Sequence, residues 1–351
     1  MRAHRRTTLP AVLLLLCSIA LLAAPAARAA AYAAAETAAA GTASATTSLS
    51  SAVAAFDVFD LDRAASLLSE AEQQSGANVD TLYYRTRIAT LRNDPAGAAR
   101  TAESCVQRFP NASRCQEALA EARISAVLSS GNVLASLEQA RAAKRAWEKA
   151  FVLDPRNARA GLLLMRYCRQ APWVAGGSDS QSRKIEAALQ RVSVSAGHHA
   201  RAVNLFADQK YDQALAAFNA AARADPGDRD PRIYVGITLA AAKRWPETAR
   251  YMEELLRRYP KFWDGWLMLA NAHQEGRLDP ERGLAAVRTY LASGINRAKP
   301  QQAQAQAILG TLLERKGDKP AAQAAFRKAL VLHEDNTLAE EGLKRLGKSC
   351  C

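Results

Sequence analysis

The sequence predicts an all-α protein built as a solenoid, in which similar pairs of antiparallel helices stack in a row. Two observations carry this prediction. The 351-residue chain is 49% hydrophobic but only 6% aromatic, whereas a β-sandwich or barrel is richer in aromatic and β-branched residues. The sequence also repeats itself, because a shift of 150 residues places Asp62-Arg63-Ala64 on Asp212-Gln213-Ala214 and Arg108-Phe109-Pro110 on Arg258-Tyr259-Pro260.

A shorter period of 34 residues lies within this repeat. Pro226 and Pro260 are 34 residues apart, as are Gly76 and Pro110, and each proline follows a stretch with helical spacing. Proline has no N–H and restricts the residue before it, so it ends the second helix of a unit. One helix pair cannot bury its own apolar face, so neighbouring pairs must stack. An irregular helical bundle, the alternative, does not explain a 34-residue step that recurs.

Small and large residues follow a fixed order within the repeated unit. The second helix carries Ala214, Phe218 and Ala221 in one unit and Ala322, Phe326 and Ala329 in another. With Leu309-Gly310, Leu313 and Gly317, these positions resemble the tetratricopeptide repeat (TPR). The resemblance covers roughly residues 45 to 347 and implies a TPR-type α-solenoid of about eight helix pairs with a C-terminal capping helix. The expected units are 45–78, 79–112, 113–157, 158–194, 195–228, 229–262, 263–298 and 299–334, followed by a cap at about Thr337 to Leu346.

A turn in the fourth unit narrows this resemblance. The residues Ala171-Pro172-Trp173-Val174-Ala175-Gly176-Gly177-Ser178 are similar to the APxxxGGS turn of exported bacterial TPR proteins, a group mostly of unassigned function. The pair Gly176-Gly177 has two interpretations. It provides backbone freedom before a helix capped by Ser178, or it forms a ligand-binding loop.

The first residues have the pattern of a secretory signal peptide. Arg2, Arg5 and Arg6 precede an apolar run, and Ala27-Arg28-Ala29 matches a small-x-small cleavage site. We therefore expect a periplasmic or secreted protein with no transmembrane segment after signal cleavage. The alternative is an uncleaved anchor, although the apolar run of about 16 residues is shorter than the roughly 20 that a span requires. A lipoprotein is not expected, because no small residue precedes Cys17.

The sequence divides into four parts. Residues 1–29 form the signal peptide, 30–45 a flexible Ala/Thr/Ser leader, 46–347 the TPR solenoid, and 348–351 a tail with Cys350 and Cys351. Cleavage after residue 29 removes four arginines and no acids, so the formal charge falls from +13 to +9. The two tail cysteines are expected to be a mobile terminal pair able to link two chains.

No catalytic motif accompanies these repeats. The sequence has no GxSxG, HExxH, Walker-type GxxxxGK[ST] or GxGxxG pattern, so no enzyme activity and no cofactor are expected. Its cysteines and histidines lack the spacing of metal ligands. Basic runs interleaved with aromatic residues are also lacking, so nucleic acid is not an expected partner.

The remaining chemistry is binding. In TPR arrays the first helix of each unit lines a concave groove, and its candidates here are Arg87, Arg114, Arg159, Arg166 and Arg169. The last three share one helical face. Because arginine binds carboxylates and phosphates with two parallel hydrogen bonds, we expect a basic site for protein or peptide partners, acidic ones among them. Toward the C-terminus the candidates are neutral or acidic: Asp264, Asn271, Gln274, Glu275 and Glu314. The alternative is a solvated arginine-rich face.

Two cysteines flank a predicted turn. Cys105 and Cys115 each lie five residues from Pro110, between two helices. In an oxidising compartment they are expected to form a disulfide, provided that their side chains face inward at the turn. The alternative is a pair of buried thiols.

Together these features predict an exported TPR scaffold or assembly factor that binds protein partners in its concave groove. A periplasmic receptor for a small anion or an anionic glycan is the second hypothesis. An accessory domain that works with an enzyme subunit is the third.

Overall fold

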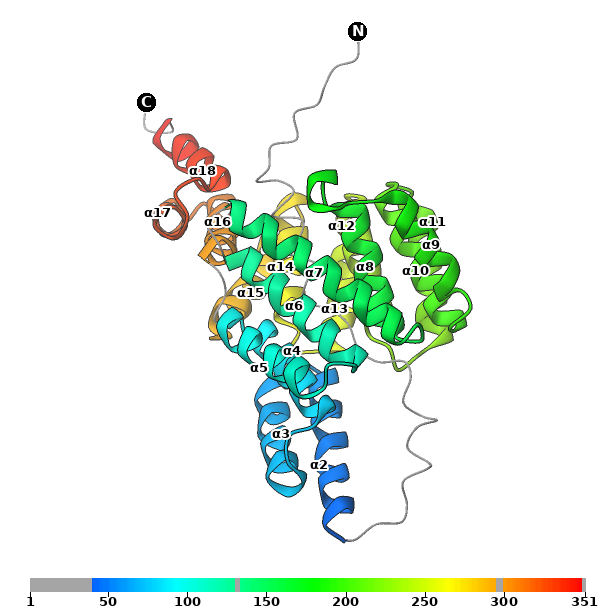
Figure 1. The fold of residues 1–351 in the computed structure, drawn as a ribbon. Coiled ribbons are helices and arrows are strands. Elements are labelled where there is room, and N and C mark those ends of the chain that lie inside the picture. The colour runs from blue at the N-terminus through cyan, green and yellow to red at the C-terminus, as the bar shows by residue number, and fades with distance from the viewer. Residues whose placement is uncertain (1–39, 130–132, 295–298, 349–351) are drawn as a thin grey trace. The chain divides into compact units, whose positions relative to one another are not determined.

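The computed structural model describes residues 40–129, 133–294 and 299–348, and these form a series of helices (Figure 1). The predicted signal peptide and the pair Cys350 and Cys351 lie outside the described residues, as do residues 130–132 of the third unit. Among the described residues, the first helix spans Ala40–Asp57, so it includes part of the predicted leader. No helix in the described part of the chain combines the length and apolar character needed to cross a bilayer.

Within the described residues, eight helix pairs follow one another, one for each predicted unit. They are α2 (Ala40–Asp57) with α3 (Leu61–Ser75), α4 (Val79–Leu91) with α5 (Pro95–Arg108), α6 (Ser113–Ser129) with α7 (Val133–Leu153), α8 (Ala158–Gln170) with α9 (Asp179–Leu189), α10 (Val194–Ala207) with α11 (Tyr211–Ala224), α12 (Asp230–Ala241) with α13 (Trp245–Arg258), α14 (Trp263–Glu275) with α15 (Pro280–Ala292), and α16 (Lys299–Arg315) with α17 (Lys319–Leu332). The predicted cap is α18 (Thr337–Lys348). The chain is an all-α TPR-type solenoid, as the repeats predict.

The turn inside a helix pair recurs with the 34-residue period. Its second residue after the first helix has a positive φ in six of the described pairs: Phe59 (62°), Asn93 (54°), Gln209 (61°), Lys243 (56°), Arg277 (49°) and Gly317 (85°). This turn geometry sets the direction in which the second helix of each of these pairs starts. In the first two pairs an aspartate caps it, because the side chains of Asp60 and Asp94 accept hydrogen bonds from backbone N–H groups three residues later.

The alternation of small and large residues fills the interior. The trios read from the sequence, Ala214, Phe218 and Ala221 and also Ala322, Phe326 and Ala329, are fully buried. Gly310 shows why a small residue is needed, since a Cβ there would lie 2.7 Å from the ring of Phe326. Backbone approach at such positions lets successive pairs stack closely.

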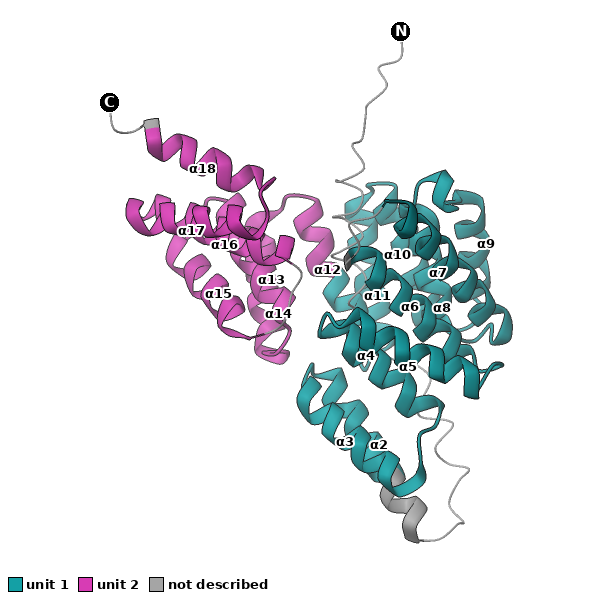
Figure 2. Cartoon of the chain, turned by 60° about the vertical axis from the view of Figure 1, so that its left-hand side comes forward, with its two compact units in different colours: residues 1–234 teal, residues 235–351 magenta. Residues whose placement is uncertain are grey.

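The chain divides into two compact units, residues 1–234 and 235–351 (Figure 2). Within unit 1 (residues 1–234), a residue just before α12 contacts the first helix pair, far away in sequence. This contact links the first repeats to the start of α12.

That contact is made by Arg229, which is 1% exposed. Its guanidinium carbon lies 5.0 Å from the ring centroid of Phe56 and 3.8 Å from that of Phe59. Its Nη1 donates a hydrogen bond of 2.6 Å to the carbonyl oxygen of Phe56, 173 residues away in sequence. Burial lowers the pKa of Arg229 to about 10. The charged guanidinium still has three partners, which are the rings of Phe56 and Phe59 and one carbonyl at the C-terminal end of α2.

A disulfide joins the end of α5 to the start of α6. Cys105 and Cys115 are both fully buried, and their Cα atoms are 5.2 Å apart. The bond closes the short loop around Pro110 and fixes where the third pair begins.

We predict that Arg229→Ala lowers the free energy of unfolding by about 3 kcal/mol, because it removes a large buried side chain. Amide hydrogen exchange in α2 and α3 should accelerate more than exchange in α10 and α11. Exposed Arg100 on α5 supplies the control, and Arg100→Ala should change stability by less than about 0.5 kcal/mol. Unchanged exchange in α2 would contradict this role for Arg229.

We also predict that Cys105 and Cys115 resist alkylation in unfolded protein that has not been reduced. Replacing both by serine should cost about 2–3 kcal/mol, the value expected for so short a closed loop. Peptide mass spectrometry checks the first point and urea unfolding the second. Alkylation of both cysteines before reduction would exclude the bond.

Candidate functional site

A cavity of about 1060 Å³ opens within unit 1. Its walls come from the first helices of five consecutive pairs, α4, α6, α8, α10 and α12, and from the connections that precede three of them. The cavity therefore lies on the face where the first helices of a TPR array are expected to bind. It is the candidate site.

Arg159, in the wall of this cavity, forms ion pairs with three acidic side chains. Its Nε lies 2.5 Å from Glu117 Oε1, its Nη2 2.7 Å from Glu121 Oε1, and its Nη1 3.7 Å from Asp230 Oδ2. Glu117 also accepts a 2.7 Å hydrogen bond from the hydroxyl of Tyr83. Burial lowers the pKa of Arg159, but Glu121 and its other anionic neighbours outweigh burial and hold this pKa well above the ordinary value. The arginine is therefore fully ionised and already neutralised.

The other predicted arginines are placed differently. Arg87 is 3% exposed, with its guanidinium carbon 4.5 Å from the ring centroid of Phe56, and it does not line the cavity. Arg114 lines the cavity, pairs with Asp80 and lies over the ring of Tyr83. The structure thus uses both cations to bind neighbouring helices.

Arg166 lines the cavity as well. It is buried, and its guanidinium carbon lies 5.2 Å from the ring centroid of Tyr234. Burial lowers the pKa of Arg166. A buried arginine that stacks on an aromatic ring keeps a fixed orientation.

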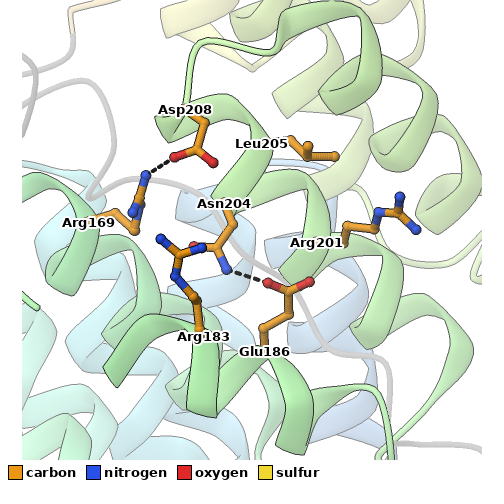
Figure 3. Close-up of a pocket in the computed structure, with 7 residues that line it drawn as sticks. All are labelled: Arg169, Arg183, Glu186, Arg201, Asn204, Leu205 and Asp208. Atoms are coloured by element: carbon orange, nitrogen blue, oxygen red, sulfur yellow. Dashed lines mark hydrogen bonds and ion pairs between the residues drawn. The ribbon is translucent and has the colours of Figure 1, made fainter. Parts of the chain in front are cut away.

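Arg169 does not lie in this cavity, which corrects its predicted place beside Arg159 and Arg166. It pairs with Asp179, at 2.7 Å, and with Asp208. Arg169 instead lines a separate cavity of about 160 Å³ between α8, α9 and α10 (Figure 3). Arg169 follows Arg159 by ten residues, so the two side chains lie on one face of an ideal helix. They nevertheless lie at opposite ends of α8.

Figure 3 shows how this smaller cavity is occupied by internal contacts. Arg169 points to Asp208, and Asn204 donates a hydrogen bond to Glu186. Arg183 and Arg201 border the cavity as exposed side chains, and neither forms an ion pair with any described residue. Both of its acids already have donors.

Two acids line the large cavity where α12 begins, Asp228 in the connection before the helix and Asp230 as its first residue. Asp228 and Asp230 are 7% and 2% exposed, and Asp228 accepts a hydrogen bond from the backbone N–H of Asp230. Burial, together with the charge of Asp230, raises the pKa of Asp228 to about 8. Burial also raises the pKa of Asp230, while Arg159 opposes the rise. Burial therefore favours the protonated form of Asp228 at neutral pH, whereas the charge of Arg159 favours the ionised form of Asp230.

Aromatic rings form another part of the wall. The ring centroid of His199 lies 5.4 Å from that of Tyr234 and 5.5 Å from that of Phe218. Burial, with the charges of Arg166 and Arg159, lowers the pKa of His199 to about 3. This imidazole is neutral at physiological pH, so it acts as a polar aromatic surface rather than as an acid or base.

The exposed edge of the cavity carries two arginines that sequence reasoning missed. Arg156 precedes α8 and Arg191 precedes α10, and both line the cavity as exposed side chains. Within residues 40–129, 133–294 and 299–348 neither forms an ion pair. The sequence pattern used for the groove covers only the first helices, and these two residues lie outside them. Their common position just before a first helix is the feature by which the sequence could have indicated them.

Cys168 is buried, and burial raises the pKa of its thiol to about 11, so it is protonated. Among the described residues, no group of three or more His, Cys, Asp or Glu is placed to hold a metal ion.

Several solved structures resemble this chain. The structure of the APC/C hetero-tetramer Cut9-Hcn1 matches with a TM-score of 0.57 and 12% identity, over 85% of this chain and 55% of that chain. A thermophilic TPR protein of Thermus thermophilus has a TM-score of 0.45 and 19% identity, over 56% of this chain and 99% of that one. A tetratricopeptide repeat protein of Parabacteroides merdae has a TM-score of 0.39 and 14% identity, over 87% and 99%.

This chain thus spans about half the length of the chain that it matches in the Cut9-Hcn1 structure. The likeness shows the fold. No protein-family model matches the sequence, and no curated protein matches it.

We predict that the Asp228 carboxyl makes unit 1 less stable as the pH rises from about 4 to about 8. Its folded pKa is raised, so the folded state keeps a proton that the unfolded state has lost, and stability falls by up to about 1.4 kcal/mol per pH unit. Asp228→Asn keeps the acceptor oxygen and should flatten this dependence in chemical unfolding at several pH values. The exposed Glu103 provides the control, since Glu103→Gln should leave the dependence intact. Equal slopes for wild type and Asp228→Asn would contradict the assignment.

Proposed function

We propose that this chain is an exported TPR scaffold that binds an acidic segment of a partner protein in the cavity of unit 1. The observation that carries the proposal is the pair Arg156 and Arg191. Both are exposed at the edge of the cavity, and neither is neutralised by a described residue. The inner arginines have carboxylates or rings as partners, whereas these two present open guanidinium groups.

The division of charge favours an elongated acidic ligand over an isolated ion. The cations without an ionic partner lie at the exposed edge, whereas the inner wall combines paired charges, such as Arg159 with Glu117, and neutral rings such as that of His199. A peptide can place carboxylates at the edge and an apolar or aromatic side chain further in. Arginine at an interface suits such carboxylates, because its planar group binds them with two parallel hydrogen bonds.

The size of the cavity fits a peptide. Pockets for small molecules measure roughly 300–1,000 Å³, and this one is about 1060 Å³ and open to solvent through an edge of exposed residues. Several residues of an extended chain fill such a volume. Backbone amides of the ligand can bond the polar wall.

The fold supports a role in assembly. Cut9-Hcn1 belongs to a hetero-tetramer, and helical solenoids present extended surfaces of this kind to other chains. Export rests on the signal-peptide pattern of residues 1–29. The mature chain should therefore lack these residues, and N-terminal sequencing of protein from the periplasm or the culture medium tests that point.

We predict that the double variant Arg156→Glu with Arg191→Glu binds an acidic peptide at least about tenfold more weakly than wild type, because attraction becomes repulsion. The probe is a fluorescein-labelled extended peptide of Glu, Leu and Pro, measured by fluorescence anisotropy. A peptide with Gln in place of Glu should bind poorly to both proteins. The matched control is Arg183→Glu with Arg201→Glu, which makes the same charge change on exposed residues of the smaller cavity.

Equal loss in both double variants would show a general charge effect and would contradict this site. Dextran sulfate serves as the competing probe for the second hypothesis. If it binds through Arg156 and Arg191 while the peptide does not bind, the chain is better described as a receptor for an anionic glycan.

A further inference from the structure

Exposed large apolar side chains of unit 1 lie mainly at the two ends of α7 and on the turn beside it. In the described residues, eight large apolar side chains are more than a third exposed, and five of them lie on α7 or on the turn against it. These five are Val133, Leu134, Val152, Trp173 and Val174. Exposed apolar residues concentrated on one element of a protein mark an interaction site more often than residues scattered over the surface do.

The turn that carries Trp173 is held in one conformation. Its carbonyl oxygens accept hydrogen bonds from three side chains: Arg141 Nη2 to Val174 at 2.7 Å, Lys144 Nζ to Gly176 at 2.8 Å, and the Tyr167 hydroxyl to Ala175 at 2.6 Å. The indole of Trp173 nevertheless remains 85% exposed. Three consecutive exposed apolar residues, Pro172 to Val174, are an unfavourable surface unless they have a partner.

The two glycines explain how the turn is built. Gly176 has a φ of 94°, a conformation that residues with a Cβ rarely adopt. A Cβ at Gly177 would collide with the carbonyl oxygen of Ala171. Ser178 then caps α9 by accepting a hydrogen bond from the backbone N–H of Gln181. The glycines therefore have the conformational role, and they leave Trp173 as the exposed group.

Cations occupy the middle of the same helix face. Arg141, Arg145 and Lys149 follow one another at four-residue steps, so they lie along one side of α7, and all three are exposed. None of them forms an ion pair with a described residue. The same side carries one acid, Glu138. We call this surface, from Leu134 to Val152 with Trp173 beside it, the α7 face.

The length of the α7 face suits a helix. At 1.5 Å per residue, the distance along the axis from Leu134 to Val152 is about 27 Å. Helix α7 has 21 residues, against 13 or 14 for α5, α11, α13, α15 and α17. The additional turns therefore lengthen the exposed surface of α7. A flexible loop would not present a rigid surface of this length.

We propose that the α7 face binds an amphipathic helix of a partner protein that has acidic residues at its centre and apolar residues at its ends. The carboxylates pair with Arg141, Arg145 and Lys149. The apolar ends contact Leu134 and Val152, and Trp173 is the anchor, since a rigid exposed tryptophan contributes a large contact area at low entropic cost. No described residue of α7 or of the turn with Trp173 lines the cavity whose edge carries Arg156 and Arg191.

The order of side chains favours a protein over a lipid surface. Helices that bind a bilayer keep one continuous apolar face and place cations at its border. On the α7 face the cations lie between the apolar ends. Burying Leu134 and Val152 together in hydrocarbon would therefore draw Arg145 in with them, at a high desolvation cost. An acidic helix pairs with these cations instead.

The test uses a synthetic amphipathic helix of five turns with Glu at its central exposed positions and Leu near both ends, measured by fluorescence anisotropy. Trp173→Ala should weaken its binding about tenfold. Arg145→Glu with Lys149→Glu should weaken it at least as much while leaving Arg141 to hold the turn. A second peptide with Lys in place of Glu should regain binding to this double variant and should not bind wild type.

The controls separate the two proposed surfaces. Arg156→Glu with Arg191→Glu should leave binding of the helix unchanged, and so should Arg183→Glu with Arg201→Glu. Circular dichroism checks that each variant stays folded. The proposal is overturned if the acidic helix does not bind wild type, or if the charge-reversed peptide fails to rescue the double variant. It is also overturned if Trp173→Ala abolishes binding to phosphatidylglycerol vesicles while peptide binding stays unchanged, which would assign the face to a membrane.

Discussion

The architecture of unit 1 depends on two adjacent residues that contact helix pairs far from their own. Arg229 stacks on Phe56 of the first pair, and Asp230 pairs with Arg159 of the fourth. Since both belong to the segment that starts α12, they connect the sixth helix pair to the first and to the fourth. The circuit runs through one aromatic ring and then through charges of alternating sign, in the order Arg229, Phe56, Arg87, Glu121, Arg159 and Asp230. A buried circuit of this kind stabilises only if every member is satisfied, because an unpaired buried charge is costly.

This circuit determines which charges remain for a ligand. An arginine-rich first-helix face would form a basic groove if its cations were exposed. Here acids from other helices neutralise the central cation, Arg159, and burial keeps Asp228 protonated. The positive potential is therefore displaced to the cavity edge, where Arg156 and Arg191 lie in water. Charges at an exposed edge are flexible and screened by salt, so they suit selection and steering of a partner more than tight binding.

The α7 face follows from a different constraint, which is the irregular length of the third repeat. Stacking buries the side of a second helix that faces its neighbours, and the outer side stays in solvent. When α7 is longer than the other second helices, its outer side gains apolar ends that no neighbouring repeat covers. The turn of the fourth repeat then adds Trp173, held by hydrogen bonds from α7 itself. The two surfaces of unit 1 thus differ in origin. The cavity comes from the regular repeats, and the α7 face comes from the irregular length of the third repeat.

The sequence by itself determined the helix pairs, their 34-residue period and the small and large core positions such as Gly310 and Phe326, because these depend on backbone geometry and contacts within one unit or between neighbours. Of the five arginines read from the sequence, Arg114, Arg159 and Arg166 lie at the candidate cavity, while Arg87 is buried behind it and Arg169 belongs elsewhere. Only the tertiary structure decided which of them are neutralised. The partners of Arg159 and Arg229 lie 38 and 173 residues away, and such pairings depend on the accumulated rotation between repeats, which no local pattern in the chain records.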